Sequence, residues 1–284
     1  MDTFLIPVDF SDVSYNAAQY AVDMAAELNV QKLIFYHSYK DTPIAPAPTA
    51  SGQHPNHIAA MKHLHTMMHK LHRLDKLKDR ILLLADNRSV REGVEAIVNS
   101  HQAAIIIMGI AGLSDIENTL IGQHTLAVAE SGAAPLLIVP RNHQHRSIKS
   151  VVYASNLTAI ETETPIAALV RLVAPLRAAL HIVHVDYDLK LQSPTTLLGQ
   201  KQLMWYLAEL QPSFETVSDQ KDIAAGINAY ARRQQADLVV LSVGNTSFLK
   251  RLFHTGVRKK LLNLTSVPIV LLKKKNHERL YQYH

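Results

Sequence analysis

Cysteine is absent from this chain of 284 residues, and glycine occurs only ten times. Without cysteine the chain has no disulfides, no thiolate metal ligands and no cysteine nucleophile. No apolar run approaches the roughly 20 residues that span a bilayer. The first segment, MDTFLIPVDFSD, lacks the basic residues and the long apolar stretch of a signal peptide. These absences predict a soluble cytoplasmic protein with no membrane partner.

Charge is also modest. Charged residues make up 19% of the chain and hydrophobic residues 48%, so a substantial core is expected. The net charge is +5, and basic residues gather late, in FLKRLFHTGVRKKLL and in the terminal segment KKKNHERLYQYH. Neither segment carries a helix-turn-helix or an aromatic RNA-binding pattern. We interpret them as a solvated helix face and a basic tail, so a nucleic-acid partner is not expected.

The sequence repeats itself. GVEAIVNSHQAAIIIMG (93–109) matches GINAYARRQQADLVVLS (226–242) at an offset of 133, and AAPLLIVP matches SVPIVLLK at the same offset. FLIPVDFS matches VVYASNLT at an offset of 147. The chain is also near the length at which one core divides into two. We therefore predict domain 1 over residues 1–141 and domain 2 over residues 149–274, followed by the basic tail.

Both halves alternate short apolar runs with amphipathic segments. Continuous apolar runs are typical of strands that helices cover on both faces. The pattern predicts an α/β fold with two doubly wound domains, each a five-stranded parallel sheet flanked by helices. The expected strands are 3–8, 32–37, 80–85, 103–108 and 135–139 in the first half, and 150–155, 179–185, 213–217, 237–242 and 268–273 in the second.

Glycines cluster near the fourth strand. We expect Gly109 and Gly112 in the loop that leaves it, and Gly122 just before the helix HTLAVAES. Glycine lets backbone approach a ligand closely, and a helix N-terminus attracts anions. Asp9, at the end of the first strand, would face the same crevice and accept hydrogen bonds from ribose or adenine. The alternative is that the glycines only form turns and Asp9 caps a helix.

The spacing G-x2-G-x9-G after the fourth strand, with P-x-D closing the first strand and IFYHSY as the second, resembles a universal stress protein domain. The resemblance extends to both halves, so the chain resembles a tandem, two-domain member of that family. It implies an adenine nucleotide α-hydrolase-like fold and a stress-response protein that acts by binding, either with ATP or without nucleotide.

The resemblance also implies site residues. Adenine and ribose contacts would fall at Pro7, Val8, Asp9 and Ser38, and the phosphate loop would comprise Met108, Gly109, Gly112, Gly122, Gln123 and His124. Two departures count against ATP. Gln123 stands where the ATP-binding members have Ser, Thr or Asn, and Asp115 and Glu117 stand where they usually carry basic residues. Carboxylates near a triphosphate oppose its binding.

Domain 2 departs further. Ser242, Asn245 and Thr255 replace the three glycines, and Asn156 replaces Asp9. Side chains then occupy the place where backbone would have to meet phosphate. We interpret domain 2 as nucleotide-free, so ATP is expected in domain 1 only.

Other patterns are weaker. The spacing of Ile58, Met61, Leu64, Met68 and Leu71 predicts the apolar face of the second helix, and Trp205 with Leu203, Met204 and Leu207 is interpreted as helix core. His65, His69 and His72 share one helix face, but without further ligands we interpret them as solvated residues and expect no metal site.

Three functions stay open: a stress protein that acts by binding, a slow ATPase, and a nucleotide-free scaffold. For the ATPase, His124 is the strongest of several weak candidates to activate a water. No catalytic triad or nucleophile elbow is found in the sequence, so an enzyme is the less favoured class. By the resemblance, the last strands PLLIVP and PIVLLK would pair the two domains as a pseudo-dimer. Two chains would associate further as a homodimer.

Overall fold

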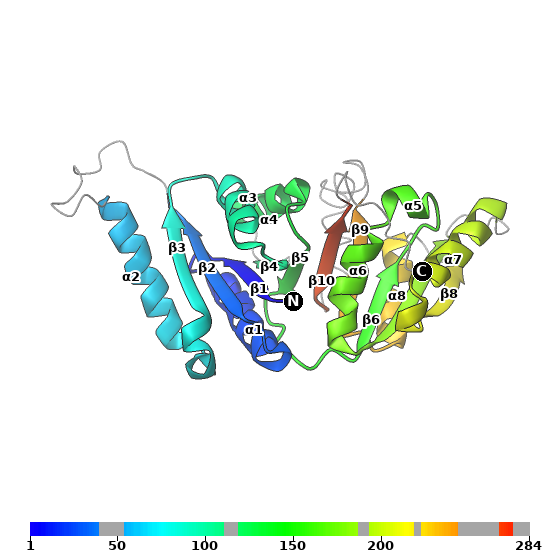
Figure 1. Cartoon of the computed structure of the whole chain (residues 1–284), viewed down its shortest axis with the longest axis horizontal. Helices are drawn as coiled ribbons and strands as arrows, with labels where there is room; N and C mark the ends of the chain where they lie inside the picture. The colour runs from blue at the N-terminus through cyan, green and yellow to red at the C-terminus, as the bar shows by residue number, and fades with distance from the viewer. Residues whose placement is uncertain (40–53, 111–118, 187–192, 219–222, 244–266, 275–284) are drawn as a thin grey trace. The chain divides into compact units, whose positions relative to one another are not determined.

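The computed structural model describes residues 1–39, 54–110, 119–186, 193–218, 223–243 and 267–274. The chain divides into two compact units, Met1–His145 (unit 1) and Arg146–His284 (unit 2), and Figure 1 labels their helices and strands. Each unit is described by itself.

Unit 1 is a five-stranded sheet in the order β3-β2-β1-β4-β5, and all of its neighbouring strands are parallel. The strands are β1 (Thr3–Pro7), β2 (Lys32–Ser38), β3 (Ile81–Asp86), β4 (Ile105–Ile110) and β5 (Leu136–Pro140). The helices are α1 (Asp12–Leu28), α2 (Pro55–Lys70), η1 (Leu74–Arg80), α3 (Val90–His101) and α4 (Thr119–Ser131).

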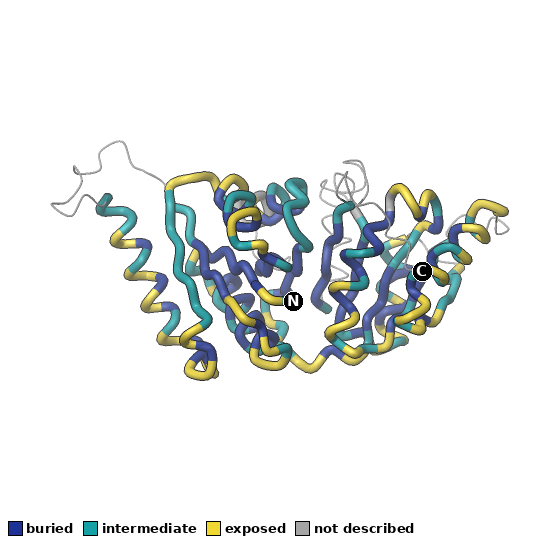
Figure 2. The backbone as a smooth tube through the Cα atoms, in the orientation of Figure 1, coloured by how far each residue is buried: buried dark blue, intermediate teal, exposed yellow. Residues whose placement is uncertain are grey.

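Helices cover both faces of this sheet. Consecutive strand residues point to opposite faces, so the side chains of Tyr36 and His37 in β2 point toward different helix layers. The backbone of Gly93 in α3 packs against the Tyr36 ring, whereas His63 of α2 lies on the side of His37. The Tyr15 hydroxyl of α1 donates to a carbonyl at the end of α2, which places α1 with α2. The buried strands between the layers form the core of the unit (Figure 2).

Local sequence sets the ends of the helices. Ser11 caps α1 by accepting a hydrogen bond from the Ser14 amide, and Asn29 ends that helix with a left-handed φ of 53°. At the start of α3, Ser89 and Glu92 form a reciprocal capping box. These caps satisfy amide groups that a helix terminus otherwise leaves unpaired.

Unit 2 repeats the strand order of unit 1. Its order β8-β7-β6-β9-β10 corresponds to β3-β2-β1-β4-β5, and its neighbouring strands are again parallel. The fold predicted from the sequence is thus confirmed in both units. The strands are β6 (Ser150–Ala154), β7 (Ala179–Asp186), β8 (Ser213–Ser218), β9 (Leu238–Val243) and β10 (Ile269–Lys273). The helices are α5 (Ile160–Glu163), α6 (Ile166–Val173), η2 (Ala174–Leu176), α7 (Pro194–Tyr206), η3 (Ala208–Leu210) and α8 (Ile223–Arg233).

The first helix of unit 2 differs from the expected single helix. It is broken into α5 and α6, and Pro165 lies between them. Proline lacks a backbone N–H and moves the residue before it out of the helical region, which accounts for the extended conformation of Thr164. The corresponding helix of unit 1, α1, runs unbroken for 17 residues.

Two expectations about helix faces were wrong in part. On α2 the buried side chains are Ala60, Leu64 and Met67, whereas the side chain of Ile58 is 42% exposed. On α7 Leu203 is buried, as is Leu207 just beyond the helix, but Trp205 is 64% exposed. Residues two apart on a helix point about 200° away from each other, so Trp205 cannot share the face of these leucines. No helix among the described residues is both long and apolar enough to cross a membrane.

Candidate functional site

A cavity of about 110 Å³ lies at the carboxyl ends of β1, β2 and β4 in unit 1. The chain runs from β1 to β2 and β3 on one side of the sheet, and adds β4 and β5 on the other. The cavity therefore lies where the strand order reverses, the usual ligand position in open α/β sheets. Of the residues that the sequence predicts for the site, it brings together Pro7, Val8, Asp9, Ser38, Met108, Gly109 and His124.

The remaining predicted residues belong to the segment that follows β4. Gly112 lies outside the described residues, as do Asp115 and Glu117. Gly122 and Gln123 lie within α4, which begins at Thr119 and therefore earlier than the sequence indicated. The amide of the fourth residue of a helix already donates to the N-cap carbonyl, as Tyr15 of α1 does to Ser11 and Gly93 of α3 does to Ser89. Gly122 is the fourth residue of α4, so it lies with Gln123 and His124 beyond the amides that the start of a helix leaves without an intrahelical partner.

Gly109 lies in β4 itself rather than in the loop, which corrects the expected position. A Cβ atom there would be 2.5 Å from the carbonyl oxygen of Val13 and 2.6 Å from its Cγ1. The first turn of α1 therefore packs directly on this strand. Gly109 is required by packing alone, whether or not a ligand is bound.

Asp9 closes a turn between β1 and α1. Its Oδ1 accepts hydrogen bonds from the Ser11 amide at 3.0 Å and from the Ser11 hydroxyl at 2.6 Å. Because Ser11 is the N-cap of α1, the alternative in which Asp9 caps this helix is wrong. Burial raises the pKa of Asp9, but the hydrogen bonds from Ser11 and Ser14 outweigh it and hold the pKa below its ordinary value. Asp9 is therefore a carboxylate at neutral pH.

Phe10, next along the chain, has a left-handed φ of 65°. A non-glycine residue in this region costs roughly 1–2 kcal/mol. Its ring lies 4.4 Å from the His37 ring and 5.3 Å from that of His63, measured between centroids. These ring contacts hold Phe10 over the end of β2.

The His37 imidazole has one defined tautomer. Its Nδ1 lies 2.8 Å from the Val8 carbonyl oxygen, and because a carbonyl only accepts, Nδ1 carries the proton. Burial lowers the pKa of His37 and the nearby His63 lowers it further, against the opposing effects of the Val8 carbonyl and Asp9. The ring is thus neutral at pH 7, with a lone pair on Nε2.

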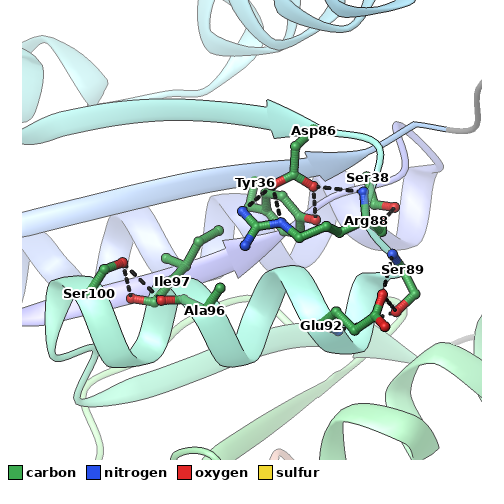
Figure 3. A network of polar contacts seen from close by, with 9 residues as sticks. All are labelled: Tyr36, Ser38, Asp86, Arg88, Ser89, Glu92, Ala96, Ile97 and Ser100. Carbon is green, nitrogen blue, oxygen red and sulfur yellow. Dashed lines mark hydrogen bonds and ion pairs between the residues drawn. The ribbon is translucent and has the colours of Figure 1, made fainter.

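A polar network beside the cavity was missed in the sequence (Figure 3). The Tyr36 hydroxyl donates to Asp86 Oδ1 at 2.8 Å, and Arg88 Nε donates to Asp86 Oδ2 at 2.9 Å. The Ser38 hydroxyl donates to the Arg88 carbonyl at 2.6 Å. The only sequence signal was an aspartate and an arginine two apart after the third strand, in ADNRS.

Charge and burial shape this network. Burial raises the pKa of Tyr36, and the neighbouring carboxylate of Asp86 raises it further. For Asp86 itself, burial raises the pKa, but hydrogen bonds from Arg88 and Tyr36 more than reverse this, so its pKa is below the ordinary value. The network joins the ends of β2 and β3 to the start of α3, and so fixes one wall of the cavity.

The loop after the first strand is built alike in unit 2. Asn156 Oδ1 accepts from the Thr158 amide at 3.1 Å, as Asp9 does from Ser11. His184 Nδ1 lies 3.0 Å from the Ser155 carbonyl oxygen, which repeats the contact of His37 with Val8. Leu157, at the position of Phe10, also has a left-handed φ, of 58°.

The carboxyl ends of the strands in unit 2 are filled differently. Ser242 stands at the position of Gly109, and its hydroxyl lies 2.7 Å from that of Tyr153, which is fully buried. A Cβ atom on Gly199 of α7 would be 1.9 Å from the Leu157 carbonyl oxygen. The backbone of α7 therefore packs directly on the loop that corresponds to the Asp9 turn.

The histidines of α2 lie on its surface. His65 and His69 are exposed on α2, and Nδ1 of His65 lies 2.8 Å from the Met61 carbonyl oxygen. His72 is exposed as well but lies in the turn beyond the end of α2 at Lys70, so the three histidines do not share one helix face as expected. Within the described part of the chain, no three His, Asp or Glu side chains are grouped as metal ligands.

Comparison with known proteins identifies the family. The model of the universal stress protein family matches residues 1–140 and 161–273. A universal stress protein from Archaeoglobus fulgidus DSM 4304 is similar over 98% of both chains, with a TM-score of 0.60 and 14% identity. A putative universal stress protein from Pseudomonas aeruginosa UCBPP-PA14 is similar over 96% of this chain and 93% of its own, with a TM-score of 0.53 and 12% identity. No curated protein matches. The chain is therefore a tandem, two-domain member of the universal stress protein family.

Proposed function

We propose that this protein acts by binding, and that unit 1 holds an adenine nucleotide such as ATP at the carboxyl ends of β1, β2 and β4. The observation that carries the proposal is the cavity in which the ionised Asp9 and the side-chain-free Gly109 lie together at the switch point of the sheet. Members of the family are described with AMP and with cAMP bound, so adenine nucleotides are the ligands to test first.

The ends of the cavity differ in chemistry. Gly109 and the free amides at the start of α4 suit phosphate, together with Gly112 in the segment that follows β4. Asp9 suits the ribose hydroxyls, which leaves the base near Ser38. Ligand pockets typically measure about 300–1,000 Å³. A nucleotide would therefore extend beyond the 110 Å³ cavity.

We propose that unit 2 binds no nucleotide. Three features support this: Ser242 bonded to Tyr153, the neutral Asn156 in place of a carboxylate, and α7 packed on the carbonyl of Leu157. Each of them removes either space or charge that the site in unit 1 offers.

Calorimetry with ATP, ADP and AMP tests the assignment to unit 1. Gly122→Val should abolish binding, because a branched side chain would stand where backbone meets phosphate. Thr255→Val, at the equivalent position of unit 2, should leave binding unchanged. Binding that survives Gly122→Val but is lost in Thr255→Val would assign the nucleotide to unit 2.

A nucleotide-free scaffold is the second candidate function. It is favoured by Gln123, Asp115 and Glu117, which depart from the pattern of the ATP-binding members. Mass spectrometry of small molecules released from freshly purified protein separates the two candidates. Released adenine nucleotide supports the first, and its release together with phosphate production would indicate a slow ATPase.

We also propose, from the sequence, that the apolar segments 135–139 and 268–273 pair within the chain. The chain has no cysteine, so engineered pairs of cysteines can test this without background. Pairs placed along the two segments should form disulfides within one chain. A failure of every pair to cross-link would contradict the pairing.

A further inference from the structure

Helix α7 of unit 2 carries apolar side chains on two of its faces. The inner face packs on the rest of the unit, because Leu203 is buried and the backbone at Gly199 lies against the carbonyl of Leu157. The outer face carries Leu198, which is 58% exposed, and Trp205, which is 64% exposed. These two residues are seven apart and so share one side of the helix. A helix that is apolar all round is typically covered on both sides.

The equivalent helix of unit 1 has a polar outer surface. Like α7, α2 connects the second strand of its unit to the third. The exposed side chains of α2 include those of Lys62, His65 and His69. Of the described residues of α2, only Ile58 is an exposed large hydrophobic side chain. The apolar outer face is therefore a feature of unit 2 and not of the repeated fold.

The basic tail, residues 275–284, begins next to α7. These ten residues lie outside the described part of the chain, and Lys274 directly precedes them. The ammonium group of Lys274 donates to the carbonyl oxygen of Glu161. The carboxylate of Glu161 accepts a hydrogen bond from the side-chain amide of Gln202 at 3.2 Å. Gln202 lies about one turn beyond Leu198 on α7, so the tail starts at the edge of the outer face.

The length and composition of the basic tail suit this face. Ten extended residues reach about 33 Å, whereas the 13 residues of α7 span about 20 Å. The first half of the tail, KNHER, is polar, and the second half, LYQYH, contains Leu280, Tyr281 and Tyr283. Packing of these three side chains on Leu198 and Trp205 would remove apolar area from water on both partners.

We propose that the basic tail packs across the outer face of α7, with Leu280, Tyr281 and Tyr283 against Leu198 and Trp205. The occupant of this apolar face is then a segment of the same chain. Other proteins reach the face only when the tail is displaced from it. This inference is independent of the nucleotide site proposed for unit 1.

Fluorescence tests the proposal in the full-length protein. Trp205 is the only tryptophan of the chain, so its emission reports on this face alone when the exciting light is not absorbed by tyrosine. The emission maximum and the quenching by acrylamide are compared between the parent and two variants of the basic tail. The apolar variant combines Leu280→Ser, Tyr281→Ser and Tyr283→Ser. The matched control combines Asn276→Ser, His277→Ser and Gln282→Ser, which leaves the apolar side chains in place.

The apolar variant should emit at longer wavelength than the parent and should be quenched more strongly, because Trp205 is then open to water. The control should behave like the parent. Equal quenching of the parent and the apolar variant would overturn the proposal. Quenching that weakens as the protein concentration rises, with a matching increase of mass in sedimentation, would also overturn it, because a second chain would then cover the face.

Engineered cysteines give a second measurement. Leu198→Cys is combined in turn with Leu280→Cys, Tyr281→Cys and Tyr283→Cys, in a chain that has no other cysteine. At least one pair should form a disulfide within a single chain. Disulfides only between chains, or none from any pair, would show that the tail does not lie on α7.

Discussion

A Cβ atom on Gly109 would lie 2.5 Å from the carbonyl oxygen of Val13, so α1 packs against β4 with no room for a side chain between them. Glycine at this position therefore has a cause that is independent of any ligand. The same contact carries the first turn of α1, with Val13 and Ser14, to the wall of the cavity. Packing and the proposed site are linked at this one residue.

Gly109→Ala should lower the free energy of unfolding by about 1–3 kcal/mol, because the backbone of α1 must move away from the strand. It should also weaken nucleotide binding, since Val13 and Ser14 move with the helix. Urea unfolding followed by circular dichroism gives the first effect, and calorimetry gives the second. Ser242→Ala, at the equivalent position of unit 2, is the control and should leave binding unchanged. A Gly109→Ala protein as stable as its parent would contradict the close packing.

Gly93→Ala should be more damaging, by about 3 kcal/mol or more. A Cβ atom there would lie 1.8 Å from the Tyr36 hydroxyl oxygen and 2.3 Å from Cζ of the ring, and the ring is held by the hydrogen bond to Asp86. Adding Tyr36→Phe removes the hydroxyl contact but not the ring contact, so the double variant should recover only part of the loss. Thermal unfolding of the two single variants and the double variant measures this coupling. Strictly additive losses would show that Gly93 and Tyr36 do not contact each other as described.

Asp86 should contribute to the free energy of unfolding at neutral pH, and this contribution should be lost in acid. Its pKa in the folded protein is below the ordinary 3.8, so the folded state binds fewer protons than the unfolded state. The stabilisation is therefore complete above the ordinary pKa and is lost as the pH falls through the lowered value. Urea midpoints between about pH 6 and pH 2.5 should fall less steeply for Asp86→Asn than for the parent. Asp2→Asn removes the same charge from a side chain that is 91% exposed, and serves as the control. Equal slopes for the parent and Asp86→Asn would contradict the lowered pKa.

Asp9→Asn should weaken nucleotide binding about tenfold or more, because a hydrogen bond to a charged acceptor is replaced by one to a neutral acceptor. The fold should be unaffected, since Asn156 makes the same turn in unit 2 with its Oδ1. Calorimetry with ATP measures the loss, and Asn156→Ala is the control that should leave affinity unchanged. Undiminished binding in Asp9→Asn would remove Asp9 from the site.

The sequence by itself determined the family, the repeat and the strand arrangement of both units. Each expected strand lies within two residues of an observed one, for example 103–108 against Ile105–Ile110 and 268–273 against Ile269–Lys273. The physical reason is local. A strand covered on both faces must be apolar along its whole length, and such runs can be read without knowledge of what packs on them.

Contacts between distant segments were decided only by the tertiary structure. Gly109 is a glycine because α1 packs on it, Trp205 is exposed although its neighbours in sequence are buried, and Tyr36 meets Asp86 across 50 positions of the chain. The tautomer of His37 is set by the contact of its Nδ1 with the Val8 carbonyl oxygen, 29 positions away in the chain. Sequence periodicity indicates which face of a segment is apolar. Which backbone or side chain lies against that face depends on the packing of elements far apart in the chain. The contacts and exposure of these residues therefore follow from the tertiary structure alone.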